Sequence, residues 1–154
     1  MYKFLEATAG EFMTRAVKTV TRDATMRELQ EMFDESDFNC FPVRENGDVV
    51  GLVTQFDFLK CFAFTTGRMI PGYAELMSRT VAEVMTPEFI YVDVGTKLTR
   101  VLQLMVDHRM KSIPVLNAEH RLVGIIARED IMRALTSTVR ADQAAGGSER
   151  PPGR

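Results

Sequence analysis

The stretch that decides the fold is residues 41–57, FPVRENGDVVGLVTQFD, because its landmarks recur further along the chain. Residues 113–130, IPVLNAEHRLVGIIARED, repeat the Pro-Val pair, the Val-Gly pair and the final aspartate in the same order, with one residue added in the loop. A Met-Thr pair stands before each stretch, at Met13-Thr14 and Met85-Thr86. Such an internal repeat indicates two similar units, which can pack face to face and form paired clefts.

Both copies show the same order of expected elements, which is strand, helix, strand, strand, helix. Runs of β-branched residues indicate the strands, and apolar residues at helical spacing indicate the helices. In the first copy, strands are expected at residues 17–21, 41–43 and 49–54, and helices at 25–33 and 55–64. In the second copy, strands are expected at residues 89–92, 113–116 and 121–126, and helices at 97–109 and 129–135. Residues 45–48 predict a hairpin turn, and residues 73–78 predict a short helix between the copies.

Composition indicates an ordinary globular protein of the cytoplasm. The chain has 154 residues, of which 45% are hydrophobic and 26% are charged, and its formal net charge is −2. This charge gives no reason to expect nucleic-acid binding, and the longest apolar runs are too short to span a membrane. The first residues lack the apolar core and cleavage site of a signal peptide. Because Cys40 and Cys61 stand in apolar stretches, we expect free buried thiols in a reducing compartment instead of a disulfide.

The ordered pattern over residues 11–135 resembles a pair of cystathionine β-synthase (CBS) domains. The resemblance rests on Met-Thr before the first strand, Pro-Val in the second strand and glycine before the last helix, repeated in register. It implies an α+β fold of two tandem β-α-β-β-α CBS repeats, packed through their sheets with pseudo-twofold symmetry. The expected limits are residues 1–63 for the first repeat with an N-terminal segment, 64–79 for a linker, 80–137 for the second repeat and 138–154 for a flexible tail.

The resemblance also implies a function. A stand-alone CBS pair, or Bateman module, commonly forms a homodimer and binds an adenine nucleotide in the clefts between its repeats. A ligand such as AMP, ADP, ATP or S-adenosylmethionine would then regulate an effector protein that the sequence does not name. No catalytic activity, obligatory cofactor, membrane partner or nucleic-acid partner is expected. The alternative is a ligand-free module that serves only protein interaction or dimerisation.

The first candidate ribose site is formed by Thr54 and Asp57, which match the family pattern of Ser or Thr followed three positions later by Asp. Both residues fall where a strand passes into a helix. An ionised carboxylate offers two acceptor oxygens, so Asp57 could accept hydrogen bonds from both hydroxyls of a ribose. A simpler interpretation makes Thr54 a helix cap and Asp57 a favourable, solvent-facing first-turn acid.

The second candidate site departs from the pattern, because Ala127 stands where Ser or Thr is expected, although Asp130 is present. This cleft is therefore expected to be empty, weaker or selective for another ligand. Arg128 could supply a phosphate contact, or it could be a solvated cation at the start of a helix. Lys111 matches a family position that often faces phosphates, or it could be an ordinary surface lysine, and its counterpart Asn39 carries no charge.

Apolar residues near both sites could wall an adenine ring, although each is also what a core position would hold. They are Phe38, Leu52, Met110 and Ile125, with Phe41 and Ile113 as further candidates. No metal site or catalytic constellation is expected, because His108 and His120 have no second ligand at metal-binding spacing and the chain has no glycine-rich phosphate loop.

Overall fold

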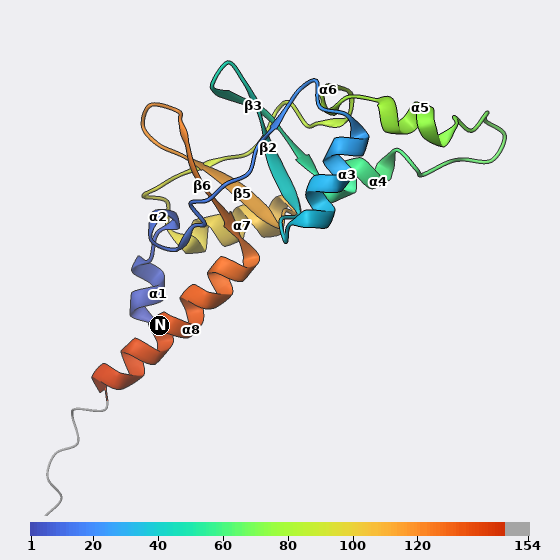
Figure 1. Ribbon diagram of the computed structural model, residues 1–154. Helices are drawn as coiled ribbons and strands as arrows, with labels where there is room; N and C mark the ends of the chain where they lie inside the picture. Colours follow the sequence, from blue (N-terminus) through green and yellow to red (C-terminus); the bar gives the residue numbers. More distant parts are fainter. Residues whose placement is uncertain (147–154) are drawn as a thin grey trace, which may run out of the picture. The chain divides into compact units, whose positions relative to one another are not determined.

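The fold is known from a computed structural model that describes residues 1–146, and it confirms the expected mixed α and β architecture (Figure 1). The chain forms two compact units, each with its own three-stranded sheet. Unit 1 contains Met1–Ala16 and the chain from Tyr91 onward, and unit 2 contains Val17–Ile90. The units therefore do not follow the order of the repeats, because the first sixteen residues belong with the second hairpin. The repeat and linker limits expected from the sequence remain a prediction.

Unit 2 is a β1-β2-β3 sheet with helices α3 to α6. Its elements are β1 Val20–Thr21, α3 Met26–Glu35, β2 Cys40–Glu45, β3 Asp48–Thr54, α4 Gln55–Lys60, α5 Tyr73–Ser78 and α6 Val81–Val84. The β2-β3 hairpin turns where expected, with positive φ angles of 52° at Asn46 and 84° at Gly47. Pro42 lies in the central strand β2, where its missing N–H could have removed a hydrogen bond. On the β1 side, however, the parallel pairing begins only at Val43, so proline removes no hydrogen bond of that pairing.

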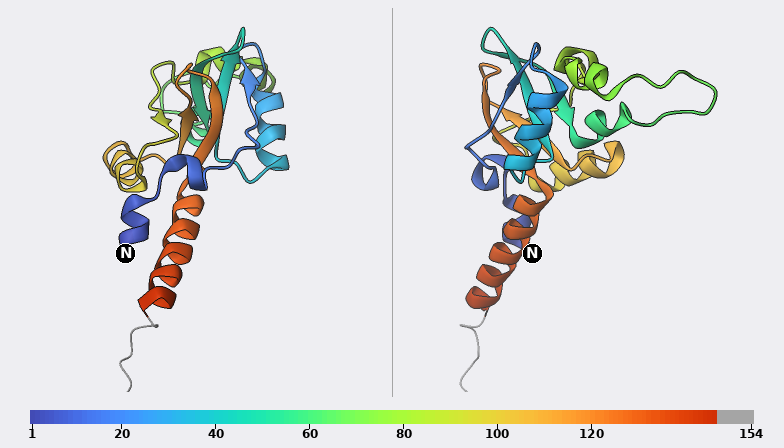
Figure 2. Two further views of the ribbon diagram at one scale, coloured as in Figure 1. Left: turned by 90° about the vertical axis from the view of Figure 1, so that its left-hand side faces the viewer. Right: turned by 45° about the vertical axis from the view of Figure 1, so that its right-hand side comes forward.

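Unit 1 repeats this sheet as β4-β5-β6, with the same parallel and antiparallel pairings. Its elements are α1 Tyr2–Glu6, α2 Ala9–Phe12, β4 Val92–Asp93, α7 Leu98–His108, β5 Ser112–Leu116, β6 Leu122–Ala127 and α8 Arg128–Gly146. The sequence pattern did not predict α1, α2 or α6. Helix α1 lies beside α8 in both views of Figure 2.

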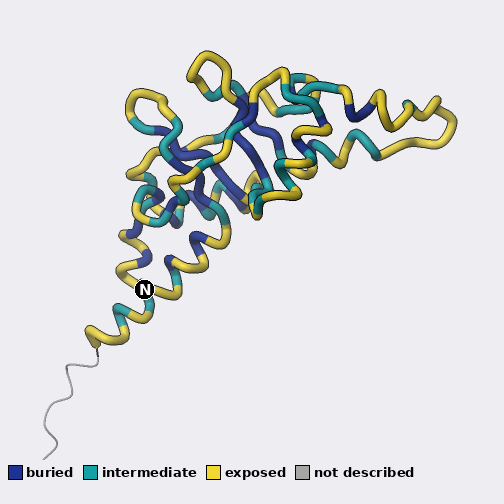
Figure 3. The backbone as a smooth tube through the Cα atoms, viewed as in Figure 1, coloured by how far each residue is buried: buried dark blue, intermediate teal, exposed yellow. Residues whose placement is uncertain are grey.

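The hairpin strands are largely buried, whereas their turns are exposed (Figure 3). In unit 2, α3 packs on the sheet, and Thr25 caps this helix by accepting a 3.2 Å hydrogen bond from Glu28 N. The core of unit 2 consists of Val20, Met26, Leu29, Phe41, Val43, Val53, Met77 and Val81. Both cysteines are free, with Cys40 buried and Cys61 half-buried. No helix within residues 1–146 is long and apolar enough to cross a membrane.

The helices that follow the two hairpins, α4 and α8, differ in length from the predicted helices. Helix α4 ends at Lys60 because the next amides turn back to carbonyls three residues earlier, as in a 3₁₀ turn. Helix α8 continues to Gly146, so the expected tail is wrong for residues 138–146, and residues 147–154 lie outside the described part of the chain. The extension is stabilised by α1, which packs along α8, and by Thr138, which is buried and donates to Ala134 O at 2.7 Å.

The first strands are shorter than expected. Only Val20–Thr21 of residues 17–21 pairs with β2, and Val92–Asp93 replaces the expected strand at 89–92. In both sheets the parallel ladder covers two residues, and at the same place the antiparallel register shifts by one residue, since Val43 and Arg44 of β2 pair with Gly51 and Val49 of β3.

The two Met-Thr segments explain why the units cross the repeat order. Thr14 pairs with Ile125 through backbone hydrogen bonds of 2.8 and 2.9 Å, and Thr86 pairs with Leu52 through bonds of 2.8 and 3.0 Å. Each segment therefore lies against the hairpin of the other repeat. The strand glycines permit this close approach, because a Cβ atom at Gly51 would lie 2.8 Å from Thr86 O.

Candidate functional site

The first site residue, Asp57, lies in the first turn of α4, where Thr54 ends strand β3 and caps the helix. Thr54 Oγ1 accepts a 3.0 Å hydrogen bond from Asp57 N, and Asp57 Oδ2 accepts a 2.9 Å bond from Thr54 N. This reciprocal pair is a capping box, so the helix-cap role of Thr54 is confirmed. Asp57 is only 5% exposed, and the expectation that it faces solvent as a first-turn acid is wrong.

An open pocket of about 540 Å³ lies at Asp57 in unit 2. Its lining residues are Asp57, Lys60, Cys61, Arg79, Glu83 and Val84. Lys60 Nζ lies 3.0 Å from Asp57 Oδ1, and its side chain is 54% exposed. Arg79 comes from the segment between α5 and α6, so the pocket brings two cations and two carboxylates together from distant parts of the unit.

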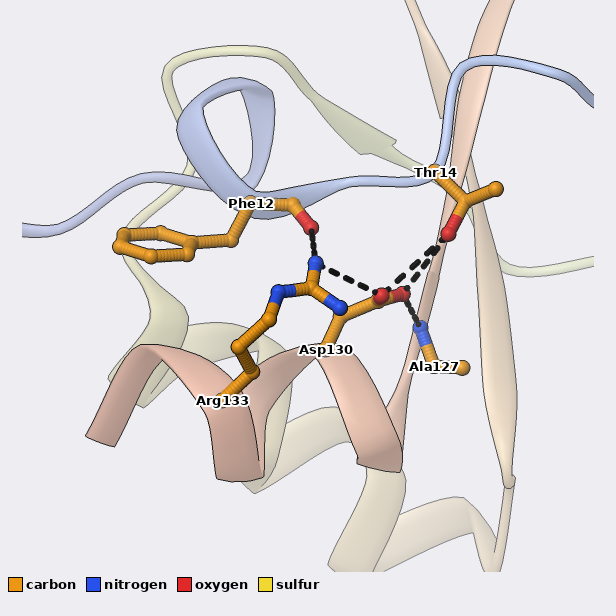
Figure 4. Close-up of polar contacts among 5 residues, drawn as sticks. All are labelled: Phe12, Thr14, Ala127, Asp130 and Arg133. Carbon is orange, nitrogen blue, oxygen red and sulfur yellow. Dashed lines mark hydrogen bonds and ion pairs between the residues drawn. The ribbon is translucent and has the colours of Figure 1, made fainter. Parts of the chain in front are cut away.

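The second aspartate, Asp130, lies in the first turn of α8 and is 4% exposed. Its Oδ2 atom accepts a 2.8 Å hydrogen bond from Ala127 N, so half of the capping box survives without the hydroxyl. Thr14 Oγ1 donates to Oδ1 at 3.2 Å, and Arg133 Nη2 donates to Oδ1 at 3.1 Å. Figure 4 shows these three donors around the carboxylate, with Arg133 Nη2 also donating to Phe12 O at 3.0 Å.

The remaining candidates of unit 2 lie in its packed interior. Leu52 is 4% exposed and stands opposite Pro42 in the hairpin. Phe38 is half-buried, packs against the core and lies 6.1 Å from Phe41 between ring centroids. These positions fit the core interpretation, and their contact with an adenine ring remains a prediction.

In unit 1 the backbone brings the two candidate cations to neighbouring positions. Arg128 N donates to Lys111 O at 3.1 Å, and both side chains are exposed. Neither side chain has a hydrogen bond to Asp130 among the described residues. Ile125 is 1% exposed within the core, and Met110 is half-buried.

Sequence reasoning missed Lys60, Arg79 and Glu83 in unit 2, and Thr14 and Arg133 in unit 1. A spacing of three residues on a helix could have indicated Lys60 and Arg133, because side chains at i and i+3 are neighbours. Arg79 and Thr14 carry no local signal, because only the tertiary fold brings Arg79 to the pocket and Thr14 to Asp130. No group of three or more His, Cys, Asp or Glu side chains in residues 1–146 could hold a metal ion.

Each repeat thus places a buried carboxylate at the start of the helix that follows its Gly-containing hairpin. The model of the CBS domain family matches this chain at residues 9–63 and 81–137. The chain therefore belongs to the CBS domain family, and the expected pair of CBS repeats is confirmed.

Proteins of an archaeon and a plant are among those similar to this chain. The protein MJ0188 of Methanocaldococcus jannaschii is 31% identical, over 81% of this chain and 43% of that protein. The chloroplastic CBS domain-containing protein CBSX1 of Arabidopsis thaliana is 30% identical, over 82% of this chain and 63% of that protein. The chain thus spans less than two thirds of these curated relatives. The fold also matches the crystal structure of CBSX2 in complex with AMP, with a TM-score of 0.71. The match covers 85% of this chain and 97% of the CBSX2 chain, and the two sequences are 25% identical.

Proposed function

We propose that the chain is a regulatory module that binds an adenine nucleotide at Asp57 and signals its occupancy to a partner protein. The main support is the buried Asp57 carboxylate, which lines a pocket together with Lys60 and Arg79. The carboxylate can accept bonds from the hydroxyls of a ribose, and neighbouring cations suit phosphate groups. The AMP in the structure of the similar protein CBSX2 supports an adenine nucleotide as the ligand.

Calorimetric titration with AMP, ADP, ATP and S-adenosylmethionine tests this proposal. We expect at least one of the four to bind the wild type and to raise its stability, by about 2.7 kcal/mol at a free ligand concentration of one hundred times Kd. Asp57→Asn should weaken that binding, because asparagine keeps an acceptor for Thr54 N but loses the charge. Absence of binding by all four ligands would refute the proposal.

The exposed face of α4 favours protein interaction as a second role. Phe56 is 69% exposed and Leu59 is 58% exposed, although both are large and apolar. Neighbouring apolar side chains left in solvent are typical of an interaction surface. We propose that this face takes part in a homodimer, which would bury roughly 1,600 Å² in total. Sedimentation should show a dimer for the wild type and a smaller species for Phe56→Glu. If no nucleotide binds, this surface supports the ligand-free interaction module instead.

The proposed role is regulatory and not catalytic, and the proposed compartment is the cytoplasm. Two cysteines that form no disulfide support a reducing environment, because disulfides form and persist mainly in oxidising compartments. Mass spectrometry after alkylation of the denatured protein, taken rapidly from cells, should find both Cys40 and Cys61 carrying the label of a reduced thiol. A disulfide between them would contradict the proposed compartment.

A further inference from the structure

The carboxylate of Asp130 has little acceptor capacity left. An ionised carboxylate has about four lone-pair positions, two on each oxygen. Oδ1 accepts from Thr14 Oγ1 and from Arg133 Nη2, and Oδ2 accepts from Ala127 N, with Thr14 Oγ1 a second, longer neighbour at 3.5 Å. Both positions on Oδ1 are therefore filled by the protein itself. A ribose that bonds one hydroxyl to each oxygen would have to displace Thr14 or Arg133.

Protein donors occupy only two of the four lone-pair positions on the Asp57 carboxylate. Oδ2 accepts from Thr54 N at 2.9 Å, and Oδ1 pairs with Lys60 Nζ at 3.0 Å. Thr86, the counterpart of Thr14, is exposed, and its hydroxyl makes no hydrogen bond to Asp57 among the described residues. Each oxygen of Asp57 therefore keeps one lone pair for a ribose hydroxyl.

Arg133 is also held more firmly than Lys60, although both follow their aspartate by three residues. The same Nη2 atom of Arg133 donates to Asp130 and to Phe12 O, so the guanidinium is fixed at two points (Figure 4). Lys60 Nζ pairs with Asp57 alone and otherwise lies 5.5 Å from the centroid of the exposed Phe56 ring, a weak contact that a flexible ammonium can leave. In both helices a cation follows the aspartate by three residues, but a ligand would displace Lys60 more easily than Arg133.

We infer that Arg133 is a specificity-determining residue that occupies Oδ1 of Asp130 and so excludes a ribose diol from unit 1. This inference rests on the proposed function, since it decides which of the two aspartates takes the nucleoside. The ligand class it excludes is any nucleoside with free 2′ and 3′ hydroxyls. Asp57 then remains as the nucleoside site of the chain.

The test uses adenosine, which has the ribose diol but no phosphate. Any change in its affinity after removal of the Arg133 guanidinium therefore does not come from a lost phosphate contact. In an Asp57→Asn background, any remaining adenosine binding reports on Asp130. Adding Arg133→Met removes the donors and keeps most of the stem, and should tighten adenosine binding about threefold to tenfold. The matched control is Arg140→Ala, which removes a charge from the same helix at an exposed side chain with no ion pair or hydrogen bond among the described residues.

The outcomes separate the inference from the proposed function. Calorimetry of the wild type with AMP, ADP, ATP and S-adenosylmethionine tests the proposed function alone, and no binding by any of the four would overturn both. Binding by the wild type, together with tighter binding after Arg133→Met and no change after Arg140→Ala, would support the inference. Unchanged, weaker or unmeasurable adenosine binding after Arg133→Met would overturn it. If Arg133→Met does not fold, Arg133→Gln is measured against the same criteria.

Discussion

Asp57 and Asp130 stand at equivalent positions of two repeats, yet their surroundings differ in one respect that matters for binding. Both are buried, both begin a helix and both accept the backbone N–H of the residue three positions earlier. Asp130 is further enclosed by Thr14 and Arg133, whereas Asp57 meets Lys60 at the edge of an open pocket. The number of donors already supplied by the protein, and not the presence of the aspartate, therefore distinguishes the two sites.

The same difference supports the separate roles proposed for the two aspartates. In unit 1 the carboxylate connects α8 to the N-terminal segment, because Thr14 donates to it directly and Arg133 donates both to it and to the Phe12 carbonyl. A buried carboxylate with several hydrogen bonds stabilises the elements that supply them. In unit 2 the corresponding carboxylate has spare acceptors at a pocket, which is what a ligand requires. A repeat can thus keep its architecture while one copy is used for structure and the other for binding.

The largest expected effect concerns nucleotide affinity. Asp57→Asn should raise the Kd for AMP about tenfold to more than a hundredfold, because a hydrogen bond to a charged group contributes about 1.5–3 kcal/mol. Asp130→Asn should change the Kd less than about threefold, since its acceptors already have partners. Calorimetry measures both values, and circular dichroism confirms the fold of each variant. A larger loss for Asp130→Asn would reverse the assignment of the two sites.

The second expected effect concerns the glycines that admit the Met-Thr segments in both units. Gly51→Ala and Gly124→Ala should each destabilise the protein by about 1–3 kcal/mol, because the new methyl group would meet a backbone carbonyl. Its Cβ atom would lie 2.8 Å from Thr86 O at Gly51, and at Gly124 it would overlap the Met13 side chain and lie 3.0 Å from Thr14 O. Urea denaturation measures both losses. Gly95→Ala is the control, since nothing lies within 4 Å of its Cβ position. If only one of the two alanine variants lost stability, the packing of the Met-Thr segments would differ between the units, as the surroundings of the two aspartates do.

The sequence was sufficient for those features that depend on local chemistry. Asn46-Gly47 marks a hairpin because both residues tolerate positive φ, and Thr54 with Asp57 marks a helix start. The repeat itself indicated two similar sheets, which the structure contains.

Features that depend on the tertiary fold could not be predicted in this way. The Met-Thr segments have the same chemistry in both repeats, so nothing local shows that each pairs with the hairpin of the other. The far end of α8 has weak apolar periodicity, and it is helical where α1 packs on it. Arg133 becomes part of the second site only because the fold brings Phe12 O and Asp130 within reach of one guanidinium.

The third expected effect concerns the two threonines of the Met-Thr segments. Thr14→Val should lower the free energy of unfolding by about 1 kcal/mol, because it removes a hydroxyl that donates to the buried Asp130. Thr86→Val should change it by less than about 0.5 kcal/mol, since Thr86 is exposed. Both values come from urea denaturation. Equal losses would contradict the different enclosure of the two aspartates.

The smallest expected effect concerns Lys60, the cation beside the open site. Lys60→Ala should raise the Kd for AMP by about twofold to fivefold at low salt, because an exposed charge pair contributes at most about 1 kcal/mol. The effect should disappear at high ionic strength, where the interaction between an exposed ammonium and a phosphate is screened.

Adenosine separates the two roles that Lys60 could have in this pocket. If its ammonium leaves Asp57 for a phosphate, the affinity for adenosine should not fall after Lys60→Ala, because this ligand carries no phosphate. Lys18→Ala is the matched control, since Lys18 is an exposed lysine of the same unit without an ion pair among the described residues. An equal loss of affinity for adenosine and AMP would mean that Lys60 acts by holding Asp57 in place. In that case the cation beside each aspartate would have a structural role, and the contrast between the two sites would rest on Thr14 and the second contact of Arg133 alone.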